Sequence, residues 1–150
     1  MDKRAIEIAR FEQAVALIRQ RFPDLHIDIT HDHAHVEAFA TIPAQPPRLQ
    51  FEVSINLQNR DELHLNAAHL WTSWFPCGEE SVFGRFVEAV LGLLSGEYRI
   101  LESFVARQHA SSKLQKPVGS SWQTVASGAS LAVLIPWKRR GQVVQNRPVA

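Results

Sequence analysis

The sequence predicts a single α+β domain, residues 1–150, in which two amphipathic helices pack on an antiparallel β-sheet. Apolar residues recur at steps of three and four in two segments, 3–22 and 79–95, as in helices with one buried face. Most other segments alternate apolar and polar residues, as half-buried strands do. A parallel sheet would need a helix after nearly every strand. The expected order is therefore helix, four strands, helix, and three or four strands.

Residues 3–22 are the first predicted helix. Asp2 can cap its start, and Pro23 ends it because proline disfavours helical backbone at the preceding residue. The predicted buried face consists of Ile8, Phe11, Val15, Ile18 and Phe22.

The next segment raises the question of a metal site, because His31, His33 and His35 are spaced by two. On one continuous strand these histidines would share a face. Apolar residues, however, are odd-numbered before the histidines and even-numbered after them, so one strand would place the two apolar sets on opposite faces. A hairpin that pairs Ile29 with Val36 removes this conflict and puts residues 31–34 in a solvated loop. We expect no metal or other cofactor; if a metal binds, these three histidines are its ligands.

Residues 48–58 alternate most cleanly and predict a half-buried antiparallel strand, followed by a turn at residues 59–61 and a returning strand. His64 and Asn66 then lie on the polar face of this hairpin. Such a face can bind a small ligand, or it can simply be the solvated side of the sheet. The predicted pairs are Leu57–Leu63, Asn56–His64 and Ser54–Asn66.

An aromatic connecting segment, HLWTSWFPCG, precedes the second helix. Trp71, Trp74 and Phe75 can anchor a partner, since tryptophan is enriched at interface hot spots. They can equally plug the open end of the sheet over the second helix. Cys77 is the only cysteine, which excludes an internal disulfide. Its place before a helix allows a reactive thiol, although a small buried thiol is the commoner case.

The second helix, residues 79–95, has a wide apolar stripe on which Phe86 and Val90 face inward, and Gly96 sits at a C-terminal cap position. Gly84 and Gly92 weaken a helix, so we expect close packing at both. Short strands follow at residues 98–107, 112–116, 121–126 and 131–137. The last, LAVLIPW, is apolar on both faces and therefore predicts a covered central strand. A basic tail starts at about residue 138, and its last ten residues, 141–150, have no predicted element.

Charge is unevenly distributed along the chain. Residues 1–100 have a net charge of −5, whereas residues 101–150 have a net charge of +6 and a single acid, Glu102. This asymmetry favours an acidic partner or a homodimer in which the basic third meets the acidic part of a second copy. Basic side chains near Trp122 and Trp137 leave single-stranded nucleic acid as an alternative partner. The residues that would bind it are Lys113, Lys116, Lys138, Arg139 and Arg140.

Taken together, these features favour a non-enzymatic cytoplasmic binding or adaptor protein that docks a protein or small ligand on its sheet. The expected contact residues are Trp71, Trp74, Phe75, His64 and Asn66. The order of helices and strands resembles that of small secretion chaperones, which dimerise and hold extended protein segments, although those proteins tend to be acidic. A small enzyme that uses the histidine-rich segment or Cys77 is the alternative. No apolar run is long enough to span a bilayer, so no membrane partner is expected.

Overall fold

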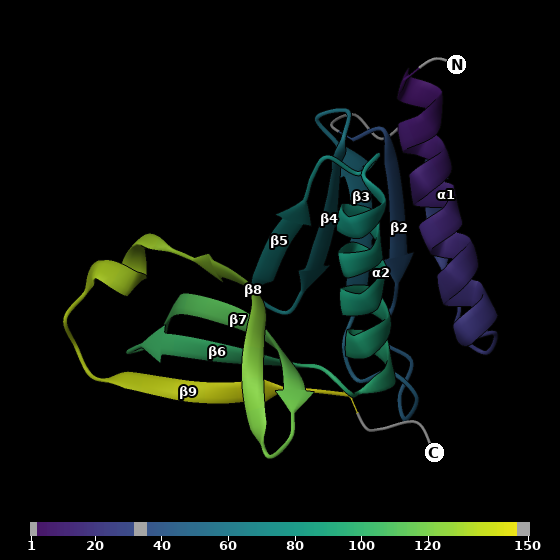
Figure 1. Cartoon of the computed structure of the whole chain (residues 1–150). Coiled ribbons are helices and arrows are strands. Elements are labelled where there is room, and N and C mark those ends of the chain that lie inside the picture. Colours follow the sequence, from purple (N-terminus) through teal and green to yellow (C-terminus); the bar gives the residue numbers. More distant parts are fainter. Residues whose placement is uncertain (1–2, 32–35, 147–150) are drawn as a thin grey trace.

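The computed structural model describes residues 3–31 and 36–146 and has an α+β fold, as predicted. Two helices accompany two antiparallel sheets (Figure 1). The first part of the chain contains α1 (Lys3–Arg21), β1 (Asp28–His31), β2 (Ala38–Ile42), β3 (Val53–Gln58), β4 (Glu62–Ala67), β5 (Leu70–Trp74) and α2 (Glu80–Ser95). The second part contains β6 (Arg99–Val105), β7 (Gln108–Val118), β8 (Ser121–Ala129), the 3₁₀-helix η1 (Leu131–Leu134) and β9 (Arg139–Val144).

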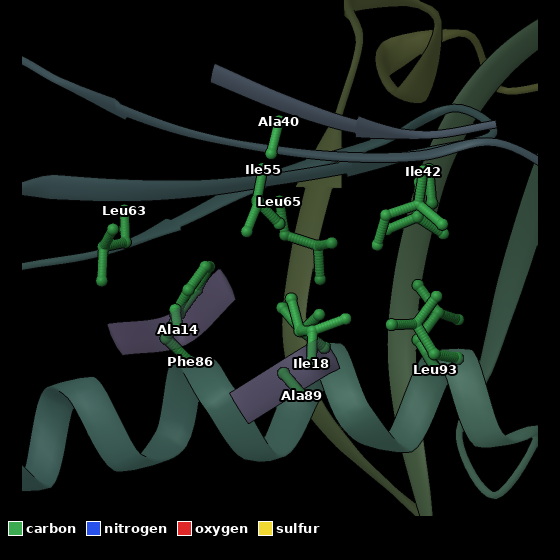
Figure 2. Close-up of a cluster of buried hydrophobic side chains, with 14 of the residues drawn as sticks. Ala14, Ile18, Ala40, Ile42, Ile55, Leu63, Leu65, Phe86, Ala89 and Leu93 are labelled. Atoms are coloured by element: carbon green, nitrogen blue, oxygen red, sulfur yellow. The ribbon is translucent and has the colours of Figure 1, made fainter. Parts of the chain in front are cut away.

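Strands β1 to β5 form a five-stranded meander in chain order, and α1 and α2 cover one face of it. The alternation of the sequence produces this arrangement, because every second residue of β2, β3 and β4 is apolar and buried against the helices. Figure 2 shows the core, with Ala14 and Ile18 of α1 and Phe86 of α2 pointing at Ile55 and Leu65 of the sheet. Phe86 and Val90 are fully buried, which confirms their predicted inward position.

Helix α2 ends as the sequence predicts. Gly96 adopts a left-handed φ of 83°, and its N–H donates to the carbonyl of Leu93. The close packing expected at Gly92 is confirmed, since a Cβ there would lie 2.4 Å from the Tyr98 ring. The same expectation at Gly84 is wrong, because no atom lies within 4 Å of the place where its Cβ would be.

Strands β1 and β2 form the predicted hairpin, but in a different register. Ile29 pairs with Ala40, not with Val36, and His31 continues the strand by pairing with Ala38 rather than entering the loop. The slip is an even number of residues, so the same side chains stay on the same face and the alternation could not detect it. His33 and His35 lie outside the described residues.

The hairpin of β3 and β4 has the predicted register: Leu57 pairs with Leu63, Asn56 with His64 and Ser54 with Asn66. The observed strand β3 is shorter than the predicted strand 48–58, because regular pairing starts at Val53. The aromatic segment was expected to be a connection, yet residues 70–74 form the edge strand β5. A tight turn with Ala68 at φ 50° returns the chain beside β4.

The second sheet has the strand order β8-β7-β6-β9 and extends away from the helices (Figure 1). The central strand predicted for residues 131–137 is wrong. Ser130 accepts a hydrogen bond from the N–H of Ala132 and caps the short helix η1, and Pro136 has no N–H for a strand ladder. The tail, for which no element was predicted, supplies β9, which pairs with β6.

Candidate functional site

The face of the five-stranded sheet opposite the helices is polar, and it brings together several residues that the sequence singled out. Register places Asn56 beside His64 and His64 beside Ser73, in a row across β3, β4 and β5. Asn66 lies opposite Trp71 in the neighbouring row. Trp71, His64 and Asn66 therefore share one surface, which we call the outer face.

His64 is held between two side chains on this face. The indole N–H of Trp71 donates to His64 Nδ1 at 2.8 Å, and His64 Nε2 lies 2.9 Å from the carboxylate of Glu62. Since an indole nitrogen can only donate, Nδ1 must carry the lone pair, and the proton of the neutral ring is on Nε2, where it is donated to Glu62. His64 is only 5% exposed. The three residues form a fixed chain of hydrogen bonds.

The carboxylate end of this chain is stabilised in its charged form. Hydrogen bonds from Asn59 and then from His64 hold the pKa of Glu62 below its ordinary value. Glu62 is thus an acceptor at neutral pH, and it orients the imidazole through the second ring nitrogen.

Trp71 is 63% exposed although its N–H is bonded to a buried residue. Beside it lies an open hollow of about 400 Å³. Nearby, Asn56 Oδ1 is buried, and none of the described residues donates a hydrogen bond to it. The site therefore combines a flat indole with several hydrogen-bond acceptors. The residues lining the hollow are Gln58, Asn59, Glu62, His64, Trp71, Thr72 and Ser73.

The remaining aromatic residues lie elsewhere. Trp74 is on the helix-covered side of β5, where its ring packs edge-on against Phe86 at 5.7 Å between centroids. This position matches the plugging interpretation for Trp74. Phe75 follows the strand and is exposed. The structure therefore separates Trp74 from Trp71 and His64.

Cys77 is completely buried in the main hydrophobic core. Burial, followed by the charges of Glu7 and Asp61, raises the pKa of its thiol to about 11. The thiol is therefore protonated at neutral pH, which argues against a nucleophile there. Its possible partners are also engaged elsewhere, His64 with Trp71 and Glu62, and His69 with Glu102.

A second polar cluster, which the sequence analysis did not identify, lies where the two sheets meet. Glu102 of β6 is 1% exposed, and its carboxylate pairs with Nδ1 of His69 from the turn between β4 and β5. The His69 ring stacks on His109 at 4.8 Å between centroids. His109 Nε2 lies 2.7 Å from the hydroxyl of Ser112, which is fully buried and so cannot meet a substrate. This cluster connects the sheets.

The basic residues of the C-terminal third do not share a surface. Lys113 points away from the core on β7, since its neighbours Ser112 and Leu114 are buried. Lys116 lies on the other face, where it lines a cleft with Arg85 of α2. The run 138–140 lies at the far end of the sheet. This distribution does not favour one continuous nucleic-acid groove.

Within the described ranges, no three His, Cys, Asp or Glu side chains are grouped closely enough to hold a metal ion. In the same ranges no helix has the length and apolar character that crossing a membrane requires. Comparison with models of known protein families, with curated proteins and with solved structures finds no match for this chain.

Proposed function

We propose that this chain is a non-enzymatic binding protein that docks a small polar ligand on the outer face of its five-stranded sheet, with Trp71 as the anchor. One observation carries the proposal: Trp71 is largely exposed, yet a hydrogen bond to the buried His64 holds it in place. An exposed aromatic ring that is already ordered loses little conformational freedom on binding, and so it favours affinity.

The chemistry of the hollow supports a donor-rich ligand. Its volume of about 400 Å³ lies in the range of small-molecule sites. Glu62, Gln58 and Asn59 line the hollow together with the exposed indole, and their side-chain oxygens are hydrogen-bond acceptors. A molecule with a flat apolar side and several O–H or N–H groups, such as a sugar or a short amide, matches this combination.

The geometry of His64 favours binding over catalysis. Both of its ring nitrogens are engaged by neighbouring side chains, so neither faces the hollow as a free base. We assign His64 the task of orienting Trp71. The buried Cys77 gives no support to the alternative of a cysteine-dependent enzyme.

Nuclear magnetic resonance of the four indole N–H groups tests the proposal. The Trp71 signal is assigned by its absence from Trp71→Phe, and a panel of mono- and disaccharides and acetylated amino-acid amides is added at millimolar concentration. We expect at least one compound to shift the Trp71 indole and the Ser73 and Asn66 amide signals. The shifts of the Ser73 and Asn66 amide signals should disappear in Trp71→Ala. All three shifts should persist in Trp122→Phe, because the Trp122 ring lies on the other sheet. A panel that leaves the Trp71 signal unmoved, or shifts that survive Trp71→Ala, would contradict the proposal.

Self-association in a reducing, cytoplasmic setting is a second proposal, supported by the charge asymmetry and the single buried cysteine. A homodimer would place the basic third of one copy against the acidic part of the other. Light scattering at about 0.15 M salt should then give twice the chain mass at micromolar protein. A constant monomer mass over a hundredfold range of concentration would rule the dimer out.

A further inference from the structure

The far end of the second sheet presents three large apolar side chains to solvent. Leu131 is 85% exposed, Leu134 77% and Trp137 66%. They belong to η1 and the segment after it, the yellow-green turn at the far left of Figure 1, well away from the helices. We call these three residues the apolar tip. Grouped, highly exposed leucine and tryptophan side chains are unusual on a water-facing surface and indicate an interaction site.

The backbone that carries the apolar tip is ordered by its own contacts. Ser130 caps η1, its hydroxyl donates to the carbonyl of His109, and its N–H donates to the carbonyl of Ala110 at 2.9 Å. Beneath the turn, Ala132 packs with Val105 and Ala110 in a small buried cluster. Val133 and Ile135, which alternate with the exposed residues, also pack against this cluster. The large leucines are held outward by the capped turn.

Positive charge lies directly beside the apolar tip. Lys138, Arg139 and Arg140 follow Trp137, and all three are exposed. Arg139 also donates to the carbonyl of Val133 at 2.6 Å, which ties the basic run to the turn. The sequence contains no Asp or Glu after Glu102, so nothing acidic in this part of the chain neutralises these cations.

We propose that the apolar tip inserts into the surface of an anionic lipid bilayer, in peripheral contact and without spanning it. Tryptophan and leucine side chains partition into the interface between headgroups and acyl chains. Lysine and arginine side chains bind anionic headgroups, so the basic residues that follow Trp137 favour an anionic surface over a neutral one. The position at the end of the sheet lets a flat bilayer approach without meeting the rest of the molecule (Figure 1).

Other occupants fit the tip less well. Two copies that met tip to tip would bring their basic runs together, and like charges repel. A nucleic acid would engage residues 138–140 and stack on Trp137, but it would leave Leu131 and Leu134 in water. An anionic lipid surface accommodates the exposed leucines and the neighbouring cations together.

Co-sedimentation of the full chain with vesicles tests the inference. We expect the protein to bind vesicles of 70% phosphatidylcholine and 30% phosphatidylglycerol, and to bind pure phosphatidylcholine at least tenfold more weakly. Leu131→Ser with Leu134→Ser should weaken binding to the anionic vesicles by at least tenfold. Lys138→Gln with Arg140→Gln should weaken it by about fivefold per charge removed, and raised salt should have the same effect.

The controls preserve the fold and act on the same sheet. Val118→Ser removes an exposed apolar side chain, and Lys113→Gln removes an exposed charge, both outside the tip. Each should bind vesicles as the unmodified chain does, and circular dichroism melts identify any variant that fails to fold. Equal sedimentation of the tip variants and the unmodified chain would overturn the inference. So would a homodimer, or binding to a single-stranded oligonucleotide, that replaces vesicle binding and is lost in the leucine variant.

Discussion

Replacing His69 with alanine should destabilise the protein far more than an ordinary surface change does. His69 is the side-chain partner of Glu102, whose carboxylate is 1% exposed at the junction of the two sheets. Removing one partner of a buried pair leaves an uncompensated charge, at a cost of about 3–5 kcal/mol. The His69 side chain is itself half exposed, so the lower end applies. We expect the free energy of unfolding to fall by about 3 kcal/mol, which lowers Tm by roughly 6–12 °C for a chain of this length.

A double-mutant cycle separates the cost of leaving the Glu102 carboxylate without its partner from the cost of removing the His69 imidazole. Glu102→Gln keeps the shape of the side chain and removes its charge, so we expect a cost of about 1 kcal/mol. His69→Ala combined with Glu102→Gln should be more stable than His69→Ala alone, because no buried charge remains. Urea denaturation at neutral pH, followed by circular dichroism, measures all three variants.

His26 is the matched control for this cycle. It pairs with Asp28 at 2.7 Å, but both side chains are largely exposed, and pairs of that kind contribute at most about 1 kcal/mol. His26→Ala should therefore stay close to the unmodified chain. A cost of His69→Ala no larger than that of His26→Ala, or a double variant no more stable than His69→Ala alone, would refute a stabilising role for this buried pair.

Three further outcomes follow from the core. Phe86→Ala should lower the free energy of unfolding by about 3–5 kcal/mol in urea, because the ring is fully buried; an unchanged melt would mean that its helix face is misassigned. Gly92→Ala should destabilise the protein, since a Cβ meets the Tyr98 ring, whereas Gly84→Ala should stabilise α2 by up to about 1 kcal/mol; equal effects would contradict this packing. Burial and nearby carboxylates raise the pKa of Cys77 from 9.0 to about 11, so the unfolded chain loses that proton first. Stability should therefore fall as pH rises from about 9 to 11, and melts at each pH should show a smaller fall in Cys77→Ala, in which the raised pKa of Tyr98 still contributes above about pH 10.

Alternation was enough to predict the hairpin of β3 and β4 but not the one before it. In the former, a short turn at Asn59 and Arg60, both with positive φ, leaves a single register that matches the apolar faces. In the latter, the connection is longer and an even slip keeps Ile29 on the buried face, so several registers satisfy the same pattern. Pattern determines the face of a strand, while the length of the turn determines the register.

The run LAVLIPW shows where the apolar pattern misleads. A strand with two apolar faces must be covered on both sides, and the pattern contains no information about whether cover exists. Two residues beside the run indicated a helical turn instead of a strand: Ser130 is a good cap for such a turn, and Pro136 interrupts a strand ladder. The polar tail then pairs with β6 in the place that the apolar run was expected to take.

Only part of the candidate site was predictable, because the sequence pattern did not show how the aromatic segment pairs with its neighbours. His64 and Asn66 were placed correctly because their strand alternates clearly. The bond from Trp71 to His64 was not predictable, since the aromatic segment looked like a connection and only its pairing with β4 brings the two residues together. Glu102 was recognisable as unusual, because it is the single acid of a basic region and occupies an apolar position of its strand. Its partner His69 was not recognisable, because it lies 33 residues earlier in the chain.

The junction of the sheets also determines how Trp71 is presented. Gly128 of β8 lies against the carbonyl of Trp71, so closely that a Cβ there would be 3.0 Å from that oxygen. The same turn that leads into β5 carries His69, which is paired with Glu102 of β6. The second sheet therefore contacts the backbone of β5 at Trp71, and through Glu102 it also binds His69, two residues earlier in the turn. Strand β5 is the edge of its sheet and has β4 as its only neighbour there. These two contacts with the second sheet therefore fix the free edge of β5 and help to hold the indole over His64.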